Sequence, residues 1–518
     1  MHPFLFALYP VLFLFTSNFD EFTENVLFLP ILLAVGFALV VYGVFLLLLR
    51  KLERAAVISS LIIILALSYK RIFEPLKGVR LVGLKLDSES TLIWIILFLL
   101  VLTVWAVFRF RTRLLTINKA LTFISVFLVG FTLVSLVGSE IRTGRLWSHS
   151  GATGHIATNN ENTSKGTPDI YYFIFDRYGS SKALKEQYNF DNSQFESFLK
   201  DKGFYIARDS TTNYPKTFLS LASSLNMEYV NYLTDRTNGG KSTDQSIVTP
   251  IIQNNKVLKY LKNKGYTYYH MGSWWTPTAS NPNADRNFIM PNSMYPGADE
   301  FTSGLLDTTI AASALKQILK DPTAVSEGPK NNDHRKRIIY EFNTINEISK
   351  IKGPKFVFVH VLIPHDPFVL DKNCKPIPEA IVGKNSHQVN YINQLQCANK
   401  NIKIAVEDIL KNSEKPPVIV LQADEGPFPM NSNLSKDQAW KNVDDTALHE
   451  KFPILNAYYL PGKKDTQLYQ SITPVNSFRI ILNEYFGEKY PLLEDKNYIF
   501  EDEKNYYKFL DVTDRVKQ

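Results

Sequence analysis

The first 140 residues of the chain consist mainly of apolar stretches, and this feature most limits what the chain can fold into. Five segments can be identified: Pro3–Thr16, Val26–Leu49, Ala55–Tyr69, Thr91–Phe110 and Ala120–Gly138. A helix that crosses a bilayer needs about 20 apolar residues. The second, fourth and fifth segments reach this length, whereas the first and third are shorter. We therefore predict a multi-span membrane region of about five α-helices in residues 1–140.

The loops between these segments predict the orientation of the membrane region. Basic residues crowd the connections at 50–54 and 109–119, the loop at 20–24 is acidic, and a basic loop at 70–85 runs against this pattern. Since basic loops stay in the cytoplasm, we expect a cytoplasmic N-terminus and an outer domain after about residue 140. A cleavable signal peptide is the alternative for the first segment, but no Lys or Arg precedes it and no small-residue cleavage site follows.

Charge and cysteine content narrow the class of protein further. Most of the net charge of +7 lies in the membrane region, so no nucleic-acid-binding surface is indicated. The two cysteines, Cys374 and Cys397, both lie in the outer part, where an oxidising compartment favours a disulfide over two free buried thiols. Without a CxxC pair they do not form a zinc pattern.

The remainder of the chain has the pattern of an α/β domain. Residues 141–167 are predicted to form a linker, because Gly151 to Thr167 are small, polar and without periodicity. In residues 168–518, amphipathic helical stretches separate apolar, strand-like runs. These runs are Ile170–Phe175, Tyr266–His270, Phe356–Leu362, Val418–Leu421 and Ile454–Leu460. Continuous apolar strands alternating with helices predict an α/β/α domain with a mostly parallel sheet covered on both faces.

Functional sites in such sheets lie at the carboxyl ends of the strands, so the residues after each strand are the candidates. The polar or aromatic groups found there are Asp176, Trp274, His365, Asp424 and Glu425. We expect them to collect on one edge of the sheet.

Three carboxylates and one hydroxyl suggest a metal site. Asp176, Asp424 and Glu425 offer oxygen ligands, and Thr217 lies just after a Pro at the start of a predicted helix, where an anion is favoured. A divalent cation bound by all four would lower the pKa of Thr217 and stabilise charge on a phosphoryl oxygen. Oxygen ligation suits Mn, Mg or Ca, with Zn as a further candidate. Asp176 could instead cap a turn, and Thr217 could be an ordinary N-cap.

Other side chains have a functional and a structural interpretation. His365 is placed to bind a phosphate or to protonate a leaving group. His360 lies within an apolar run and is interpreted as a core residue. His449 could be a further ligand or acid, or a surface residue at a helix end. Trp274 could form an aromatic wall for a headgroup or sugar, or pack in the core.

The motifs PDIYYFIFDRYG, NYPKTFLSLASSLNMEY, His365-Asp-Pro-Phe and Asp424-Glu-Gly together resemble the sulfatase-like branch of the alkaline phosphatase superfamily. With the apolar N-terminal region, the chain looks like the membrane-anchored lipoteichoic acid synthases and phosphoethanolamine transferases of bacterial envelopes. The resemblance covers about residues 168–500, and the membrane part is similar only in layout.

The resemblance implies a membrane-anchored phosphotransferase of the bacterial inner membrane with its catalytic domain outside. Thr217 would take a headgroup from a phospholipid donor, releasing diacylglycerol, and pass it to an envelope glycan or lipid. The metal ligands carried over are Asp176, Thr217, Asp424 and the residue after it. That residue is Glu425, where the family has His, which puts zinc in doubt. The residues after Thr217 lack the sulfatase C/S-x-P-x-R motif, which disfavours sulfate hydrolysis. A phosphoesterase or sulfatase-type hydrolase, or a catalytically degenerate binding domain, are the alternatives.

Overall fold

The computed structural model describes residues 1–18, 24–73, 80–81, 84–85, 89–143, 167–290, 300–312, 329–429, 439–463 and 467–517. Nearly all of the predicted linker therefore lies outside the described residues. The chain divides into two compact units. One comprises Met1–Ser150 and Met294–Asp321, and the other comprises Gly151–Ser293 and Pro322–Gln518.

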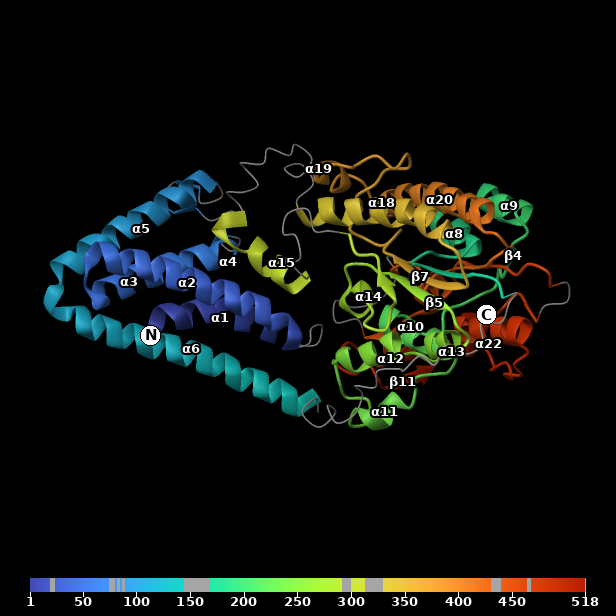
Figure 1. The fold of residues 1–518 in the computed structure, drawn as a ribbon, viewed down its shortest axis with the longest axis horizontal. Coiled ribbons are helices and arrows are strands. Elements are labelled where there is room, and N and C mark those ends of the chain that lie inside the picture. The colour runs from blue at the N-terminus through green and yellow to red at the C-terminus, as the bar shows by residue number, and fades with distance from the viewer. Residues whose placement is uncertain are drawn as a thin grey trace. The chain divides into compact units, whose positions relative to one another are not determined.

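The first unit is helical (Figure 1). Its elements are α1 (His2–Ser17), α2 (Phe28–Leu49), α3 (Leu52–Leu67), α4 (Tyr69–Phe73), β1 (Arg80–Leu81), β2 (Leu84–Lys85), α5 (Glu89–Arg109), α6 (Leu114–Thr143) and α15 (Glu300–Asp307). The short helix α15 comes from the middle of the chain, and its Phe301 ring lies 6.0 Å from the ring of Phe15 in α1.

Helices α2 and α6 are long and apolar enough to cross a membrane, α6 over Leu114–Gly138. Helix α1 and the segment Trp94–Arg109 of α5 are apolar but shorter. Large apolar side chains of the two long helices are exposed, for example Phe28 and Phe123. The five predicted apolar segments are thus helices, while the prediction that all of them span a membrane stays a prediction.

A seven-stranded sheet forms the centre of the second unit, in the order β4-β9-β8-β3-β7-β5-β6. The strands are β3 (Ile170–Phe175), β4 (Tyr205–Ile206), β5 (Thr267–Met271), β6 (Arg286–Asn287), β7 (Lys355–Val361), β8 (Val418–Gln422) and β9 (Asn456–Tyr459). The five strands from β8 to β6 are parallel to one another, whereas β9 and β4 pair antiparallel at one edge. This confirms the predicted mostly parallel sheet.

Helices cover the sheet on both faces, as Figure 1 shows. One layer contains α10 (Thr217–Asn226), α12 (Thr249–Gln253), α13 (Lys256–Asn263) and α22 (Pro474–Phe486); the other contains α8 (Ser181–Tyr188), α9 (Ser193–Asp201), α18 (Pro329–Ser349) and α20 (His387–Asn412). Successive residues of a strand point to opposite faces. Tyr172 therefore packs in the first core and Tyr171 in the second, and every residue of β3 is buried.

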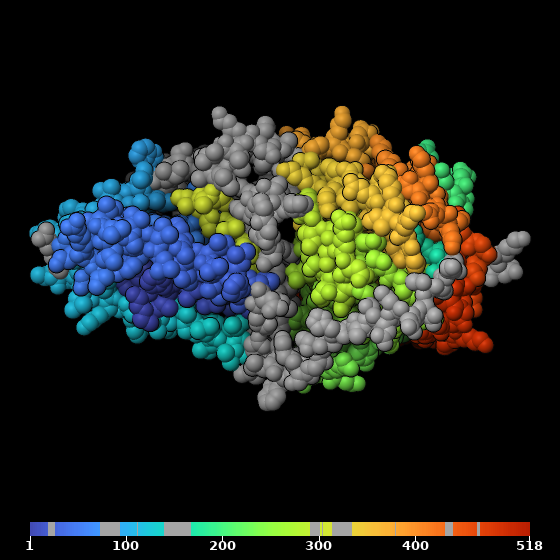
Figure 2. Space-filling model, viewed as in Figure 1, coloured from blue at the N-terminus to red at the C-terminus, as the bar shows by residue number. Residues whose placement is uncertain are grey.

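Shorter elements complete this unit. They are α11 (Leu233–Arg236), α14 (Thr276–Ala279), α19 (Glu379–Val382), α21 (Asp445–Lys451), α23 (Thr513–Lys517) and the hairpin of β10 (Tyr498–Phe500) with β11 (Phe509–Asp511). The segment around α14 lies at the surface of this unit, beside α18 (Figure 2). The predicted disulfide is present: Cys374, in the loop after β7, bonds Cys397 of α20 with an S–S distance of 2.03 Å.

Candidate functional site

Three neighbouring parallel strands bring polar side chains to one edge of the sheet. Strand β3 lies between β7 and β8, and Ile174 of β3 pairs with His360 on one side and Gln422 on the other. Asp176 follows β3 directly, and its backbone N–H continues the ladder to the carbonyl of Val361 at 3.1 Å. Asp424 lies two residues after the end of β8 at Gln422. This is the edge of the sheet at which the sequence predicts that polar side chains collect.

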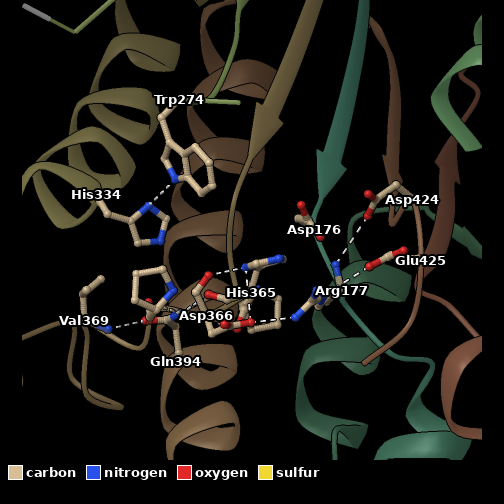
Figure 3. A network of polar contacts seen from close by, with 12 residues as sticks. Asp176, Arg177, Trp274, His334, His365, Asp366, Val369, Gln394, Asp424 and Glu425 are labelled. Atoms are coloured by element: carbon tan, nitrogen blue, oxygen red, sulfur yellow. Dashed lines mark hydrogen bonds and ion pairs between the residues drawn. The ribbon is translucent and has the colours of Figure 1, made fainter. Parts of the chain in front are cut away.

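Asp176, His360 and Asp424 form a compact buried cluster. One ligand atom from each lies within 4.8 Å of the others. His360 Nε2 is 3.7 Å from Asp176 Oδ2. In Figure 3 the carboxylates of Asp176 and Asp424 lie side by side on neighbouring strands. Among the described residues, this is the group of His, Cys, Asp and Glu side chains that could hold a metal ion.

Several buried atoms in and beside this cluster have no hydrogen-bond partner within the described part of the chain. Buried atoms with no hydrogen bond include Asp176 Oδ1, His360 Nε2, Asp424 Oδ2 and Glu425 Oε2. A buried polar atom left unpaired costs about 1–3 kcal/mol, so native proteins rarely leave several together. Two carboxylates and an imidazole are also common metal donors. The residues present therefore fit a divalent cation.

His360 is held with one nitrogen directed away from the cluster. Its Nδ1 lies 2.8 Å from the hydroxyl of Thr278, which donates in turn to the carbonyl of Trp275 at 3.4 Å. This contact leaves Nε2 of His360 facing Asp176. Such an outer hydrogen bond typically fixes the tautomer of a metal-binding histidine. The interpretation of His360 as a satisfied core residue is therefore wrong for Nε2, although the ring is fully buried.

Thr217 is the first residue of α10, and Lys216 occupies the N-cap position without a side-chain cap. The ordinary N-cap interpretation of Thr217 therefore does not apply. Its hydroxyl interacts with the Asp424 carboxyl and works to lower the pKa of that group. Thr212 donates to the carbonyl of Asp424 at 2.5 Å, which fixes the loop that carries this carboxylate.

The two aspartates of the cluster experience opposite fields. Burial works to raise the pKa of Asp176, but its interactions with His365, His360 and Arg177 hold it well below its usual range. Burial and the neighbouring charge of Asp176 raise the pKa of Asp424 well above its usual range. Like charges that share a buried site repel each other, and a bound cation would reverse this effect.

Glu425 lies beside the cluster in a buried ion pair. Its Oε1 is 2.7 Å from Lys451 Nζ and 3.2 Å from Arg177 Nε. Burial lowers the pKa of Lys451 to about 8 in spite of this pairing. A Cβ on Gly426 would lie 2.5 Å from the carbonyl oxygen of Lys451, so the close approach of the two segments requires glycine there. The expectation that Glu425 ligates a metal stays a prediction.

His365 and Asp366 lie on the loop after β7. Asp366 Oδ1 is 2.6 Å from Arg177 NH1 and 3.4 Å from His365 Nδ1. Gln394 of α20 holds this loop by donating to the carbonyl of His365 at 2.7 Å and accepting from the N–H of Val369 at 2.8 Å (Figure 3).

Trp274 and His449, which were predicted to bind substrate, contact other side chains and backbone groups of the domain. The indole N–H of Trp274 donates to Nδ1 of His334 in α18 at 3.3 Å (Figure 3). Burial lowers the pKa of His334 to about 3, so this ring is neutral and accepts the bond. His449 of α21 instead lies 3.0 Å from the carbonyl of Arg515, in the C-terminal helix. The substrate-binding roles expected for Trp274 and His449 stay predictions.

The structure also brings forward residues that the sequence reasoning did not select: His360, Arg177, Lys451 and Asp366. A signal for His360 was present, because it lies one residue before the end of a strand that neighbours the Asp176 strand. For Lys451 no local signal exists, since its contact with Glu425 depends on how α21 packs.

Comparison with known proteins gives matches only among solved structures: no family model and no curated protein matches the chain. The C-terminal periplasmic domain of EptC from Escherichia coli matches with a TM-score of 0.41 and 13% identity, over 68% of this chain and 94% of that one. The integral membrane lipooligosaccharide phosphoethanolamine transferase A from Neisseria meningitidis matches with a TM-score of 0.39 and 11% identity, over 93% and 95%. A sulfatase annotated in Bacteroides thetaiotaomicron matches with a TM-score of 0.38 and 13% identity, over 63% and 72%.

These structures are phosphoethanolamine transferases and sulfatases, the kinds of protein that the sequence motifs resemble. Because the TM-scores and identities are low, the functional argument below rests on the site's own geometry. That geometry defines a three-layer α/β domain with a buried Asp-His-Asp cluster beside a threonine at a helix start.

Proposed function

We propose that the chain is a membrane-anchored, metal-dependent phosphotransferase. It would move a phospholipid headgroup, of phosphoethanolamine or phosphoglycerol type, to an envelope glycan or lipid. The observation that carries the proposal is the convergence of the unpartnered buried atoms of Asp176, His360 and Asp424 next to the hydroxyl of Thr217.

Asp176, His360 and Asp424 would hold the ion, with Thr217 and Glu425 as further candidates. A bound divalent ion lowers the pKa of a neighbouring hydroxyl and neutralises charge that develops on a phosphoryl oxygen. The imidazole of His360 suits zinc, and the carboxylates also suit manganese. The notable departure from the family pattern is Glu425, and His360 of β7 would supply the nitrogen ligand that Glu425 does not.

Thr217 would act as the nucleophile. Its Oγ forms a bond to the phosphorus of the donor, and the bond from phosphorus to the diacylglycerol oxygen breaks. The proton of Thr217 ends on the released diacylglycerol, with His365 as the group that assists. In the second step an acceptor hydroxyl attacks the phospho-Thr217 intermediate, the Oγ–P bond breaks, and Thr217 regains a proton.

The helical unit supports a lipid substrate. Helices α2 and α6 have the length and apolarity of membrane spans, and their exposed apolar side chains are costly to hydrate. We place the chain in the bacterial inner membrane, as a multi-span protein with the catalytic unit outside. An anchor of this kind keeps the active site close to a phospholipid donor.

A catalytically degenerate binding domain is the second candidate. The observation that favours it is the pairing of Glu425 with Lys451 and Arg177. These two cations already neutralise part of the negative charge that a metal ion would otherwise neutralise. A hydrolase that uses water as the acceptor differs only in the second step.

A headgroup-transfer assay with a labelled phospholipid donor separates these functions. Thr217→Ala should lower diacylglycerol release by more than about a thousandfold, as loss of a nucleophile does, and Thr217→Ser should retain part of it. Thr249→Ala is the matched control, since Thr249 also begins a helix, α12, and should leave turnover unchanged. Full turnover in Thr217→Ala would contradict the mechanism. Release of free headgroup phosphate without transfer would indicate the hydrolase.

A further inference from the structure

The carboxylate of Asp366 lies between two positively charged or protonatable side chains beside the proposed active site. One oxygen, Oδ1, contacts both Arg177 NH1 at 2.6 Å and His365 Nδ1 at 3.4 Å (Figure 3). The side chain of Asp366 is 51% exposed, whereas that of Arg177 is 20% exposed. The same nitrogen of His365 also contacts the backbone carbonyl of Asp366. The Asp366 carboxylate thus occupies the place where the Arg177 guanidinium and this ring converge.

Arg177 is held firmly on its other side. Its Nε pairs with Glu425, which is 3% exposed, and its carbonyl accepts a hydrogen bond from Tyr391 at 2.8 Å. Its φ of +63° is in the left-handed region, which residues with a side chain rarely adopt. Strain of this kind persists where the surroundings impose it, often at functional sites. The guanidinium is therefore fixed by the loops that follow β3 and β8.

The two ion pairs of Arg177 differ in strength. An exposed ion pair contributes little to stability, because water competes for both partners. Breaking a buried pair leaves an uncompensated charge and is strongly destabilising. The contact with Asp366 is therefore the one that yields to a competing anion, while Arg177 stays paired with Glu425.

We propose that Asp366 occupies the position of a substrate phosphate oxygen, and that an incoming phosphate group displaces it from Arg177 and His365. Arg177 is then a phosphate-binding residue, and Asp366 limits the affinity of the site for phosphate. The guanidinium fork matches a phosphate as it matches a carboxylate, so the exchange needs only a movement of the exposed Asp366 side chain. The proposal rests on the proposed function in that the phosphate belongs to the donor headgroup.

Inorganic phosphate binding to the full-length chain in detergent tests this exchange, measured by calorimetry with and without added Zn or Mn. Asp366→Asn should bind phosphate between about threefold and tenfold more tightly than the wild type, because a competing like charge is gone. Arg177→Lys should bind it more weakly, since lysine lacks the fork. Asp235→Asn removes an exposed aspartate of α11 and is the matched control, expected to have no effect.

Unchanged or weaker phosphate binding by Asp366→Asn would overturn the proposal. Asp366→Ser provides a second variant if the first does not fold. Failure of the proposed function can be told apart from failure of the exchange. If the proposed function is wrong, Thr217→Ala keeps the turnover of the wild type, whereas Asp366→Asn can still bind phosphate more tightly. If Thr217→Ala loses turnover and Asp366→Asn binds phosphate like the wild type, only the exchange is wrong.

Discussion

At the scale of a single residue, Glu425 shows how the surrounding side chains determine what a carboxylate can bind. A carboxylate directly after Asp424 is a reasonable metal ligand in the sequence. In the fold, Lys451 and Arg177 already compensate its charge, with Oε1 shared between them. The histidine that faces the cluster comes from β7 instead. The side chains of the candidate site thus come from different strands.

The buried pair of Lys451 and Glu425 predicts a large stability effect. Lys451→Met leaves Glu425 buried with one cation fewer, which should lower the free energy of unfolding by about 3 kcal/mol. Thermal or urea unfolding of the purified chain measures this. The control is Lys352→Met, because Lys352 pairs with Glu414 while 84% exposed, and that pair should contribute little. Equal effects of the two changes would contradict the argument.

Part of the candidate site could be predicted residue by residue. Asp176 and Asp424 follow continuous apolar strands, and Thr217 follows a Pro at a helix start, so their location at one sheet edge required only the rule for parallel strands. His360 could not be assigned by type, because a histidine in an apolar strand is usually a core residue. Its role depends on the pairing of Ile174 with His360, a long-range register that one sequence does not specify.

At the scale of elements, the strands with long apolar runs were predictable and the short ones were not. All five predicted runs correspond to β3, β5, β7, β8 and β9. Strands β4 and β6 have two residues each, too few to show a periodicity. The antiparallel direction of β9 also could not be predicted, because an apolar run does not encode its direction.

The disulfide between the loop after β7 and α20 predicts a second stability effect. It joins residues separated by 23 positions, and closing a loop of that size contributes roughly 3 kcal/mol in the chain-entropy model. Reductant should therefore lower the unfolding temperature of the wild type. The chain carrying both Cys374→Ala and Cys397→Ala serves as control and should not respond to reductant. A wild type that is equally insensitive would show that the bond does not stabilise the unit.

At the scale of the whole molecule, the sequence predicts a helical region and an α/β domain, and both are present as separate units. The assignment of α15 to the helical unit was not predictable, because nothing local distinguishes its eight residues from the helices around them. The candidate site is likewise a product of the complete fold. Residues 176, 360 and 424 meet only when the central strands have paired.

The central claim is that this assembled cluster binds a divalent ion, and the metal content of the full-length chain tests it most directly. We expect about one equivalent of zinc or manganese in the wild type, its loss in His360→Ala and Asp424→Asn, and its retention in Glu425→Gln. Retention in His360→Ala with loss in Glu425→Gln would show that Glu425 is the third ligand. A wild type without bound metal, even after addition of both ions, would contradict the account and favour the degenerate binding domain.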